Sequence, residues 1–260
     1  MEVILVETEQ EGALLAARMI AGQVRLKPDS VLGLATGATP LPIYEELVRR
    51  HREEGLSFRQ VTTFNLDEYV GLPPDHPASY RRYMQDHLFG KVDLAPERAH
   101  LPDGMALDIP ACCARYEEQI RQAGGVDLQL LGLGQDGHIG FNEPSSSLTS
   151  RTRLKTLTPH TVAAHRPAFP TGQEVPRHVL TMGVGTIMEA RRCLLVAFGV
   201  RKANAVARMV EGPLTAMVPA SILQMHPRAT VLVDEAAGRN LRMRDYYRDV
   251  YRRKPDWQRE

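Results

Sequence analysis

The chain has 260 residues, of which 43% are hydrophobic and 24% charged, and its 32 basic and 31 acidic side chains give a net charge of +1. This is the composition of an ordinary globular protein of a length that suits one sizeable α/β domain, so we predict a single domain over residues 1–260. The balanced charge offers no basic surface for nucleic acid or an anionic membrane, and neither is expected as a partner.

The N-terminus carries an acid at Glu2 and a short apolar run over 3–6. It has neither the basic start of a signal peptide nor the length of a membrane span, and we predict a first strand there. Three cysteines, Cys112, Cys113 and Cys193, form neither a disulfide framework nor a zinc-binding spacing. A reducing cytoplasm is therefore the expected location.

Short apolar runs alternate with amphipathic stretches along the chain. This alternation is typical of a mainly parallel sheet with helices on both faces. The predicted strands are 3–6, 31–35, 61–65, 127–133, 178–182, 193–198 and 230–234. The predicted helices are 9–24, 40–54, 79–88, 109–123, 202–210 and 236–253.

Ligands of such sheets bind beyond the carboxyl ends of the strands. The loops after Ala35, Asn65, Leu133 and Phe198 are therefore expected to meet at one edge of the sheet. The region 142–177 is rich in Ser, Thr, Pro and His and lacks strong periodicity. Because so long a region inside a compact domain is usually functional, we predict a lid, with an irregular surface excursion as the alternative.

A turn with one glycine joins the second predicted strand to the next helix. Gly37 permits a tight turn, Thr36 and Thr39 offer hydroxyls, and the backbone amides at Ala38 and the helix start point toward one anion. The segment is neither a Walker loop nor a dinucleotide fingerprint. It predicts a phosphate cradle, and the plain alternative is a threonine cap on an ordinary helix.

A cation should complete such a cradle, and Lys202 follows another strand at the same predicted edge. It is one of only five lysines in the chain, although a solvated residue in the first turn of a helix would look the same.

Asp67 and Glu68 directly follow the predicted strand 61–65. Partial desolvation there would raise the pKa of Asp67 toward the range that suits a general base. Taken alone, a loop acid pair or a helix cap is the more ordinary explanation.

The densest motif is Gly-Leu-Gly-Gln-Asp-Gly-His-Ile-Gly-Phe-Asn-Glu-Pro, residues 132–144. Its glycines allow a ligand to approach the backbone, while Asp136 and Glu143 can orient and charge the imidazole of His138. The motif predicts an acid–base group. A metal site is the rival, but helical ligand spacing and a neighbouring cysteine are both missing.

In their order along the chain, these motifs closely resemble the glucosamine-6-phosphate deaminase family. The matching segments are Thr-Gly-Ala-Thr-Pro, Asn-Leu-Asp-Glu-Tyr-Val-Gly-Leu and Gly-Gln-Asp-Gly-His-Ile-Gly-Phe-Asn-Glu-Pro, followed by 150–158 and 180–186. The resemblance covers nearly the whole chain up to about residue 235.

The resemblance implies a modified doubly wound, Rossmann-like fold and the conversion of glucosamine 6-phosphate to fructose 6-phosphate and ammonia, with neither organic cofactor nor metal. It implies that Asp67 is the proton-transfer base and that Asp136, His138 and Glu143 open the sugar ring. The implied phosphate ligands are Thr36, Gly37, Ala38, Thr39, Arg166 and Lys202. Arg153 and Lys155 match basic residues of an allosteric site in some members.

The chain departs from the family pattern in three places. Ala38 replaces a frequent glycine, which requires that this position does not need a positive φ. The segment 159–170, which contains Arg166, differs from the usual lid. The tail near 246–248 does not align with the allosteric members, which leaves an oligomer of identical chains open.

Two other functions remain as alternatives. A 6-phosphogluconolactonase would share the fold and the glycine-rich loop, but lactone hydrolysis needs no proton abstraction at C2 and hence no base at Asp67. A non-catalytic sugar-phosphate sensor would also share the fold, but the acid–base set is intact and no DNA-binding segment is present. An enzyme for a different amino-sugar phosphate would belong to the same class as the deaminase.

Overall fold

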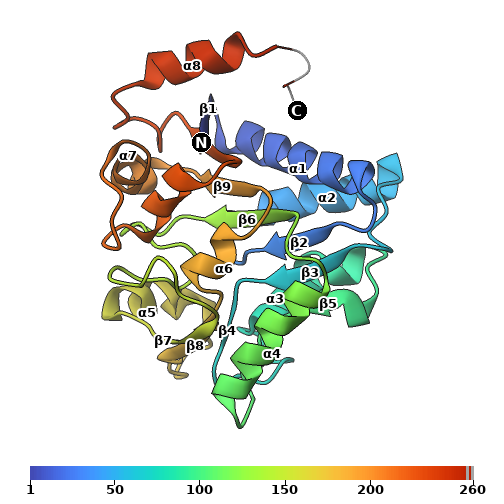
Figure 1. Cartoon of the computed structure of the whole chain (residues 1–260). Coiled ribbons are helices and arrows are strands. Elements are labelled where there is room, and N and C mark those ends of the chain that lie inside the picture. The colour runs from blue at the N-terminus through green and yellow to red at the C-terminus, as the bar shows by residue number, and fades with distance from the viewer. Residues whose placement is uncertain (256–257, 259–260) are drawn as a thin grey trace.

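A seven-stranded parallel sheet forms the centre of the computed structural model, which describes residues 1–255 and 258 and leaves the end of the predicted 1–260 domain outside the described residues. Its strands are β1 (Glu2–Val6), β2 (Val31–Leu34), β3 (Thr62–Asn65), β5 (Ala99–His100), β6 (Leu128–Gly132), β9 (Cys193–Ala197) and β10 (Ala229–Asp234). Their order is β1-β10-β9-β6-β2-β3-β5, with every neighbouring pair parallel (Figure 1). The prediction of a mainly parallel, doubly wound sheet is confirmed.

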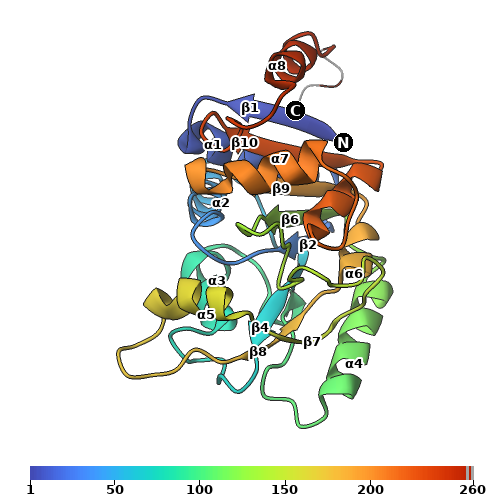
Figure 2. The same cartoon turned by 90° about the vertical axis from the view of Figure 1, so that its left-hand side faces the viewer.

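Helices cover both faces of this sheet. The α-helices of the described chain are α1 (Glu9–Leu26), α2 (Leu41–Glu54), α3 (Tyr80–His87), α4 (Ile109–Gln122), α5 (Pro159–His165), α6 (Val184–Met188), α7 (Ala203–Glu211) and α8 (Arg244–Arg252). Short 3-10 helices occupy Phe89–Lys91, Pro96–Arg98, Arg166–Ala168, Val200–Lys202 and Pro219–Met225. The chain reverses its direction across the sheet after β5, so right-handed crossovers put α1 and α2 on one face and α4, α6 and α7 on the other (Figures 1 and 2).

A second, three-stranded antiparallel sheet lies below the main one in both views (Figures 1 and 2). It consists of β4 (Asp67–Tyr69), β7 (Arg153–Thr156) and β8 (His178–Thr181), in the order β4-β8-β7. The predicted strand 178–182 exists, but it belongs to this sheet and not to the parallel one. The region 142–177 is also more regular than expected, because it contains β7 and α5.

The C-terminal helix is shorter than predicted. Residues 236–243 form turns, and α8 begins only at Arg244. A glycine at position 238 and the side chain of Asp234, which accepts a hydrogen bond from the backbone N–H of Ala237, favour a turn directly after β10.

One cluster of buried apolar side chains extends from Val3 to Leu241. All six residues of β10 and all five of β9 are buried, which explains their continuous apolar sequence. Within the described residues, no helix is both long and apolar enough to cross a bilayer.

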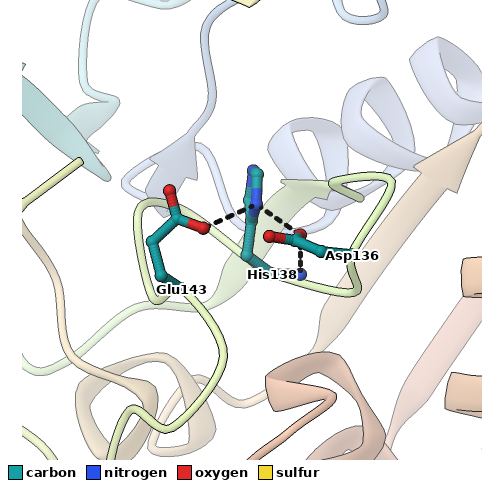
Figure 3. Close-up of side chains that lie close together, drawn as sticks. All are labelled: Asp136, His138 and Glu143. Atoms are coloured by element: carbon teal, nitrogen blue, oxygen red, sulfur yellow. Dashed lines mark hydrogen bonds and ion pairs between the residues drawn. The ribbon is translucent and has the colours of Figure 1, made fainter. Parts of the chain in front are cut away.

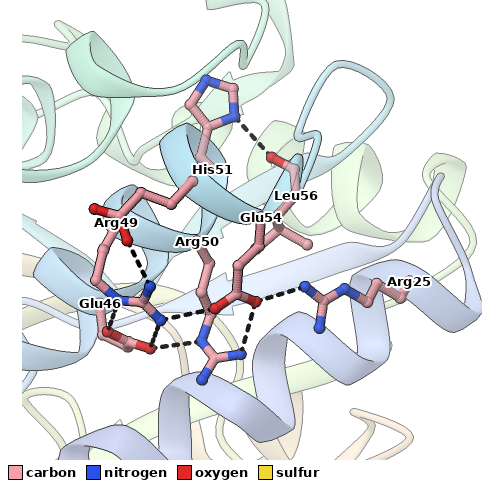
Figure 4. Close-up of polar contacts among 8 residues, drawn as sticks. Arg25, Glu46, Arg49, Arg50, His51, Glu54 and Leu56 are labelled. Carbon is pink, nitrogen blue, oxygen red and sulfur yellow. Dashed lines mark hydrogen bonds and ion pairs between the residues drawn. The ribbon is translucent and has the colours of Figure 1, made fainter.

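Surface ion pairs connect the C-terminal half of α2 to α1 (Figure 4). Arg25 of α1 lies 2.8 Å from Glu54, and Glu46 lies 2.7 Å from both Arg49 and Arg50 on α2. The predicted phosphate loop precedes the opposite end of α2. Exposed pairs such as Arg25–Glu54 contribute at most about 1 kcal/mol each, whereas Glu46 is buried.

Candidate active site

The four loops that carry the predicted site residues follow neighbouring strands of the parallel sheet. The strands β9, β6, β2 and β3 are adjacent, and all of them end at the same edge. Lys202, the glycine-rich loop, the Thr36–Thr39 turn and Asp67 come directly after these strands. The topology therefore brings together residues that are up to 166 positions apart in the sequence (202 − 36).

His138 lies between two carboxylates (Figure 3). Its Nδ1 is 2.7 Å from Oδ1 of Asp136 and 3.7 Å from Oε2 of Glu143. The backbone N–H of His138 also donates to Oδ1 of Asp136, at 3.1 Å. Burial raises the pKa of Asp136, but the hydrogen bond and charge of His138 outweigh burial and hold this pKa below its usual range. Asp136 is therefore a stable anion beside the imidazole and can orient the ring.

Two glycines in this loop are required by close contacts. A Cβ atom at Gly134 would lie 2.3 Å from the His138 ring, which is an impossible overlap. A Cβ at Gly140, whose φ is 55°, would lie 3.0 Å from the Thr181 hydroxyl and 3.6 Å from Oδ2 of Asp67. The glycine-rich loop thus passes directly beside Asp67.

Asp67 is buried, with 5% of its surface exposed. It begins β4 and pairs with Thr181 of β8, so its backbone is fixed by the second sheet. Burial raises the pKa of Asp67 well above its ordinary value, and the charge of Glu68 adds to the increase. A carboxylate with a raised pKa and a fixed backbone suits the role of a general base.

Glu68 has a different part in the structure. Its Oε1 accepts hydrogen bonds from the backbone N–H groups of Tyr69 (2.9 Å) and Tyr80 (3.0 Å), and its Oε2 accepts one from Arg81 (2.9 Å). These bonds join β4 to the first turn of α3. Glu68 thus anchors the strand that carries Asp67 to α3.

The predicted phosphate loop turns at a glycine with a positive φ. Gly37 has a φ of 105°, whereas Ala38 has no positive φ, so the alanine is tolerated there. No side chain caps α2, whose N-cap is Pro40, and the alternative of a threonine cap is therefore wrong. The carbonyl oxygen of Gly37 accepts a hydrogen bond from the Tyr83 hydroxyl at 2.7 Å, which holds the loop in place.

The two predicted phosphate cations differ in their positions. Lys202 is half-buried, and its Nζ donates to the carbonyl oxygen of Leu133 at 2.6 Å, beside the glycine-rich loop. Burial lowers the pKa of Lys202, and Arg201 adds to this effect. Arg166 is exposed and its guanidinium donates to the carbonyl oxygen of Gln173, within the segment predicted as a lid. The structure thus brings Lys202, but not the Arg166 guanidinium, into contact with the glycine-rich loop.

Arg153 and Lys155 lie on β7. Arg153 donates to Oδ1 of Asn142 at 2.9 Å and lines a hollow of about 1080 Å³ between α4 and β7. Burial lowers the pKa of Lys155, and the charge of Arg153 lowers it further. His138 does not line this hollow. Arg153 in its wall is nevertheless hydrogen-bonded to Asn142, the residue that precedes Glu143.

The acid–base group was also tested as a metal site. One ligand atom from each of Asp136, His138 and Glu143 lies within 4.8 Å of the others. However, the 2.7 Å separation of Nδ1 and Oδ1 is that of a direct polar contact, whereas two ligands at about 2.1 Å from one tetrahedral ion would stand more than 3 Å apart. This geometry favours proton transfer over metal binding.

A known protein family matches this chain over most of its length. The sequence profile described as "Glucosamine-6-phosphate isomerases/6-phosphogluconolactonase" matches residues 7–232. A glucosamine-6-phosphate deaminase of Arthrobacter sp. (strain FB24) is 55% identical over 258 residues, which cover 99% of each chain.

The chain belongs to this family.

A glucosamine-6-phosphate deaminase of Mycolicibacterium smegmatis is 54% identical over 259 residues, again covering 99% of each chain. The solved structure of a monomeric glucosamine-6-phosphate deaminase superposes with a TM-score of 0.90 at 46% identity and covers 92% of this chain and 100% of its own. A 6-phosphogluconolactonase from Trypanosoma brucei superposes with a TM-score of 0.72 at 21% identity, covering 92% of this chain and 98% of its own, and shares the fold alone.

Several residues that surround the site of this family member were not found from the sequence. Thr158 and Thr161 contact Glu143, and His165 contacts Tyr69. Their hydroxyl and imidazole groups lie in the region predicted as a lid, but nothing in the sequence shows which residues of a lid face inward. The N-cap preference of Thr158 before Pro159 is the one signal that could have located the start of α5.

Proposed function

We propose that the chain converts glucosamine 6-phosphate to fructose 6-phosphate and ammonia, using Asp67 and the Asp136–His138–Glu143 group for acid–base chemistry. Relatives named glucosamine-6-phosphate deaminase match it over almost its full length at more than 50% identity, and the chain is an enzyme of this type. The observation that carries the residue roles is the position of a buried Asp67 beside the loop that holds an ion-paired His138.

Each residue has a role that its surroundings support. His138, charged and oriented by Asp136, passes a proton to the ring oxygen and opens the sugar. Asp67 then takes a proton from C2 and returns it to C1 through an enolamine, as in an aldose–ketose isomerisation. Water hydrolyses the resulting imine and releases ammonia. The raised pKa of Asp67 suits a group that must both accept and return one proton.

The phosphate would bind at the turn formed by Thr36, Gly37, Ala38 and Thr39, with Lys202 as its cation. One fixed end lets a single carboxylate reach both C1 and C2. Arg166 would have to leave the Gln173 carbonyl to reach the same phosphate. The hollow beside Arg153, with Lys155 on the same strand, is our candidate for a second anion site.

We further propose that the chain acts in the cytoplasm as a single-domain enzyme without metal or organic cofactor. The deaminase with the TM-score of 0.90 is described as monomeric. Whether this chain also acts as a monomer is a separate question that light scattering can answer.

The test is to treat the purified chain with a chelator, incubate it with glucosamine 6-phosphate and measure ammonia and fructose 6-phosphate together. Equal amounts of both products, absent with Asp67→Asn, are expected. Hydrolysis of 6-phosphogluconolactone without ammonia release would replace this proposal with a lactonase. Binding of the sugar phosphate with neither reaction would point to a sensor.

A further inference from the structure

The two carboxylate oxygens of Glu143 have separate surroundings. Oε1 accepts a hydrogen bond from the Thr161 hydroxyl at 2.6 Å and a longer one from Thr158 at 3.4 Å. Oε2 has no hydrogen-bond partner in the part of the chain that the structure describes, and it lies 3.7 Å from Nδ1 of His138. One oxygen is thus held by α5, while the other remains directed toward the imidazole.

The contact with Thr161 is buried. Glu143 is 3% exposed and Thr161 is 2% exposed, so water has little access to their hydrogen bond. A buried carboxylate that loses such a donor leaves an unsatisfied charge, which makes this contact decisive for the orientation of Glu143. The orientation of Thr161 is itself fixed, because its backbone N–H donates to the N-cap side chain of Thr158 at 3.2 Å.

A second contact places α5 against the strand of the base. At the other end of the helix, Nδ1 of His165 lies 2.5 Å from the hydroxyl of Tyr69, two residues after Asp67 on β4. The His165 ring also lies edge-on to Tyr69, with centroids 6.2 Å apart. The same seven-residue helix therefore contacts both the Glu143 loop and the strand that carries Asp67.

We propose that Thr161 is a positioning residue that couples docking of the lid to ring opening, because only the docked α5 holds Glu143 in the orientation that serves His138. The Thr161 hydroxyl is hydrogen-bonded to Glu143 and Thr158, so its effect on His138 passes through Glu143. This inference rests on the proposed deaminase activity. It adds that the Asp136–His138–Glu143 group can open the sugar ring only when α5 is docked.

The experiment is a double-mutant cycle in the full chain with Thr161→Val, Glu143→Gln and the two combined. Valine has nearly the shape of threonine without the hydroxyl, and we expect Thr161→Val to lower kcat by about 10- to 100-fold, the effect of one hydrogen bond to a charged group. In the Glu143→Gln background the same substitution should cost less than about threefold, because its target is already altered. Thr161→Ser should restore most of the rate, and Thr171→Val, at an exposed lid position, is the matched control.

A deuterium label at C2 of the substrate separates the steps. If Thr161 serves ring opening, Thr161→Val makes that step limiting and reduces the isotope effect on kcat, whereas Asp67→Asn increases it. Equal losses from Thr161→Val in both backgrounds, or an unreduced isotope effect, would overturn the proposal. Failure of the wild type to release ammonia would instead refute the deaminase function, so the two failures are distinguishable.

Discussion

At the scale of single residues, Asp67 shows how this site separates two neighbouring carboxylates. The Glu68 carboxylate accepts hydrogen bonds from three backbone N–H groups. Asp67 is buried beside the glycine-rich loop, and this burial and the charge of Glu68 raise its pKa. Two acids adjacent in the sequence therefore have different tasks, one structural and one chemical.

Asp67→Asn should lower kcat by roughly 10²- to 10⁴-fold, the usual contribution of a positioned acid–base group. The amide has the same shape but cannot accept the C2 proton, so the Michaelis constant for glucosamine 6-phosphate should change little. Steady-state kinetics measures both values. A turnover number equal to that of the wild type would remove Asp67 from the mechanism.

Lys202→Ala should act mainly on binding. The substitution removes one charge-assisted contact to the phosphate, and the Michaelis constant should rise by at least about tenfold while kcat falls less. Lys91→Ala, on the 3-10 helix Phe89–Lys91, is a charge-matched control and should leave both values unchanged. A defect confined to kcat would contradict the anchoring role.

The residues of the predicted site differ in how far the sequence could specify them. Asp67 and Asp136 could be predicted because each directly follows a strand or stands within a dense glycine motif. The contact of Thr161 with Glu143 could not, since it spans 18 positions and depends on how the lid folds back. For Arg166, the sequence supplied the charge but not the direction of the side chain, which points to Gln173.

At the scale of elements, α5 is held at both of its ends by polar contacts, to Glu143 and to Tyr69. The contact with Tyr69 involves His165, whose imidazole can bind a proton. Burial lowers the pKa of His165 from 6.5 to about 4, and the nearby charge of His138 contributes to this. In the docked lid, the imidazole of His165 is therefore neutral and accepts a hydrogen bond from the Tyr69 hydroxyl.

This predicts that docking of the lid depends on pH. An undocked His165 binds its proton near pH 6.5 and the docked residue only near pH 4, so docking keeps its full stability above pH 6.5 and loses it progressively as the pH falls toward 4. The protection factors of the α5 amides against hydrogen exchange, which correct for the intrinsic pH dependence of exchange, should fall across this range. The same loss of protection in His165→Asn, which does not titrate, would contradict the assignment to His165.

Strand prediction succeeded or failed according to length and burial. The apolar runs that became β6, β9 and β10 could be read because every one of their residues faces the interior, apart from Gly132 at the end of β6. β4 and β7 were missed because their sequences, Asp-Glu-Tyr and Arg-Leu-Lys-Thr, are short and polar. These strands exist because β8 lies between them, a pairing that local sequence does not encode.

At the scale of the whole molecule, α8 packs against β1, the outermost strand of the parallel sheet (Figure 1). Tyr247 and Tyr251 pack against the main core, and Lys254 lies 2.9 Å from Glu2. An edge strand presents unpaired backbone groups to other chains, so a covering helix reduces the risk of association. The core cluster also includes residues from Val3 to Leu241.

Adjacent tyrosines of α8 allow this packing to be tested. Tyr247→Ala should lower Tm by about 2–8 °C, since it removes roughly 1–2 kcal/mol of burial and each kcal/mol corresponds to about 2–4 °C in a chain of this size. Tyr246→Ala is the control, because that side chain is 58% exposed. Equal shifts of the two variants in a thermal melt would show that α8 contributes nothing through its inner face.

The ion pair between Glu2 and Lys254 also shows that positions 2 and 254 of the chain are neighbours in space, on the side of the molecule away from the lid. A short linker could join them, and the chain could be reopened by circular permutation at the exposed lid turn between Thr171 and Gly172. In such a permutant α5 and β8 would no longer be joined directly to each other. Full turnover of the permutant would then mean that the lid works through its docking contacts. The peptide connection between α5 and β8 would serve only to bring those contacts together.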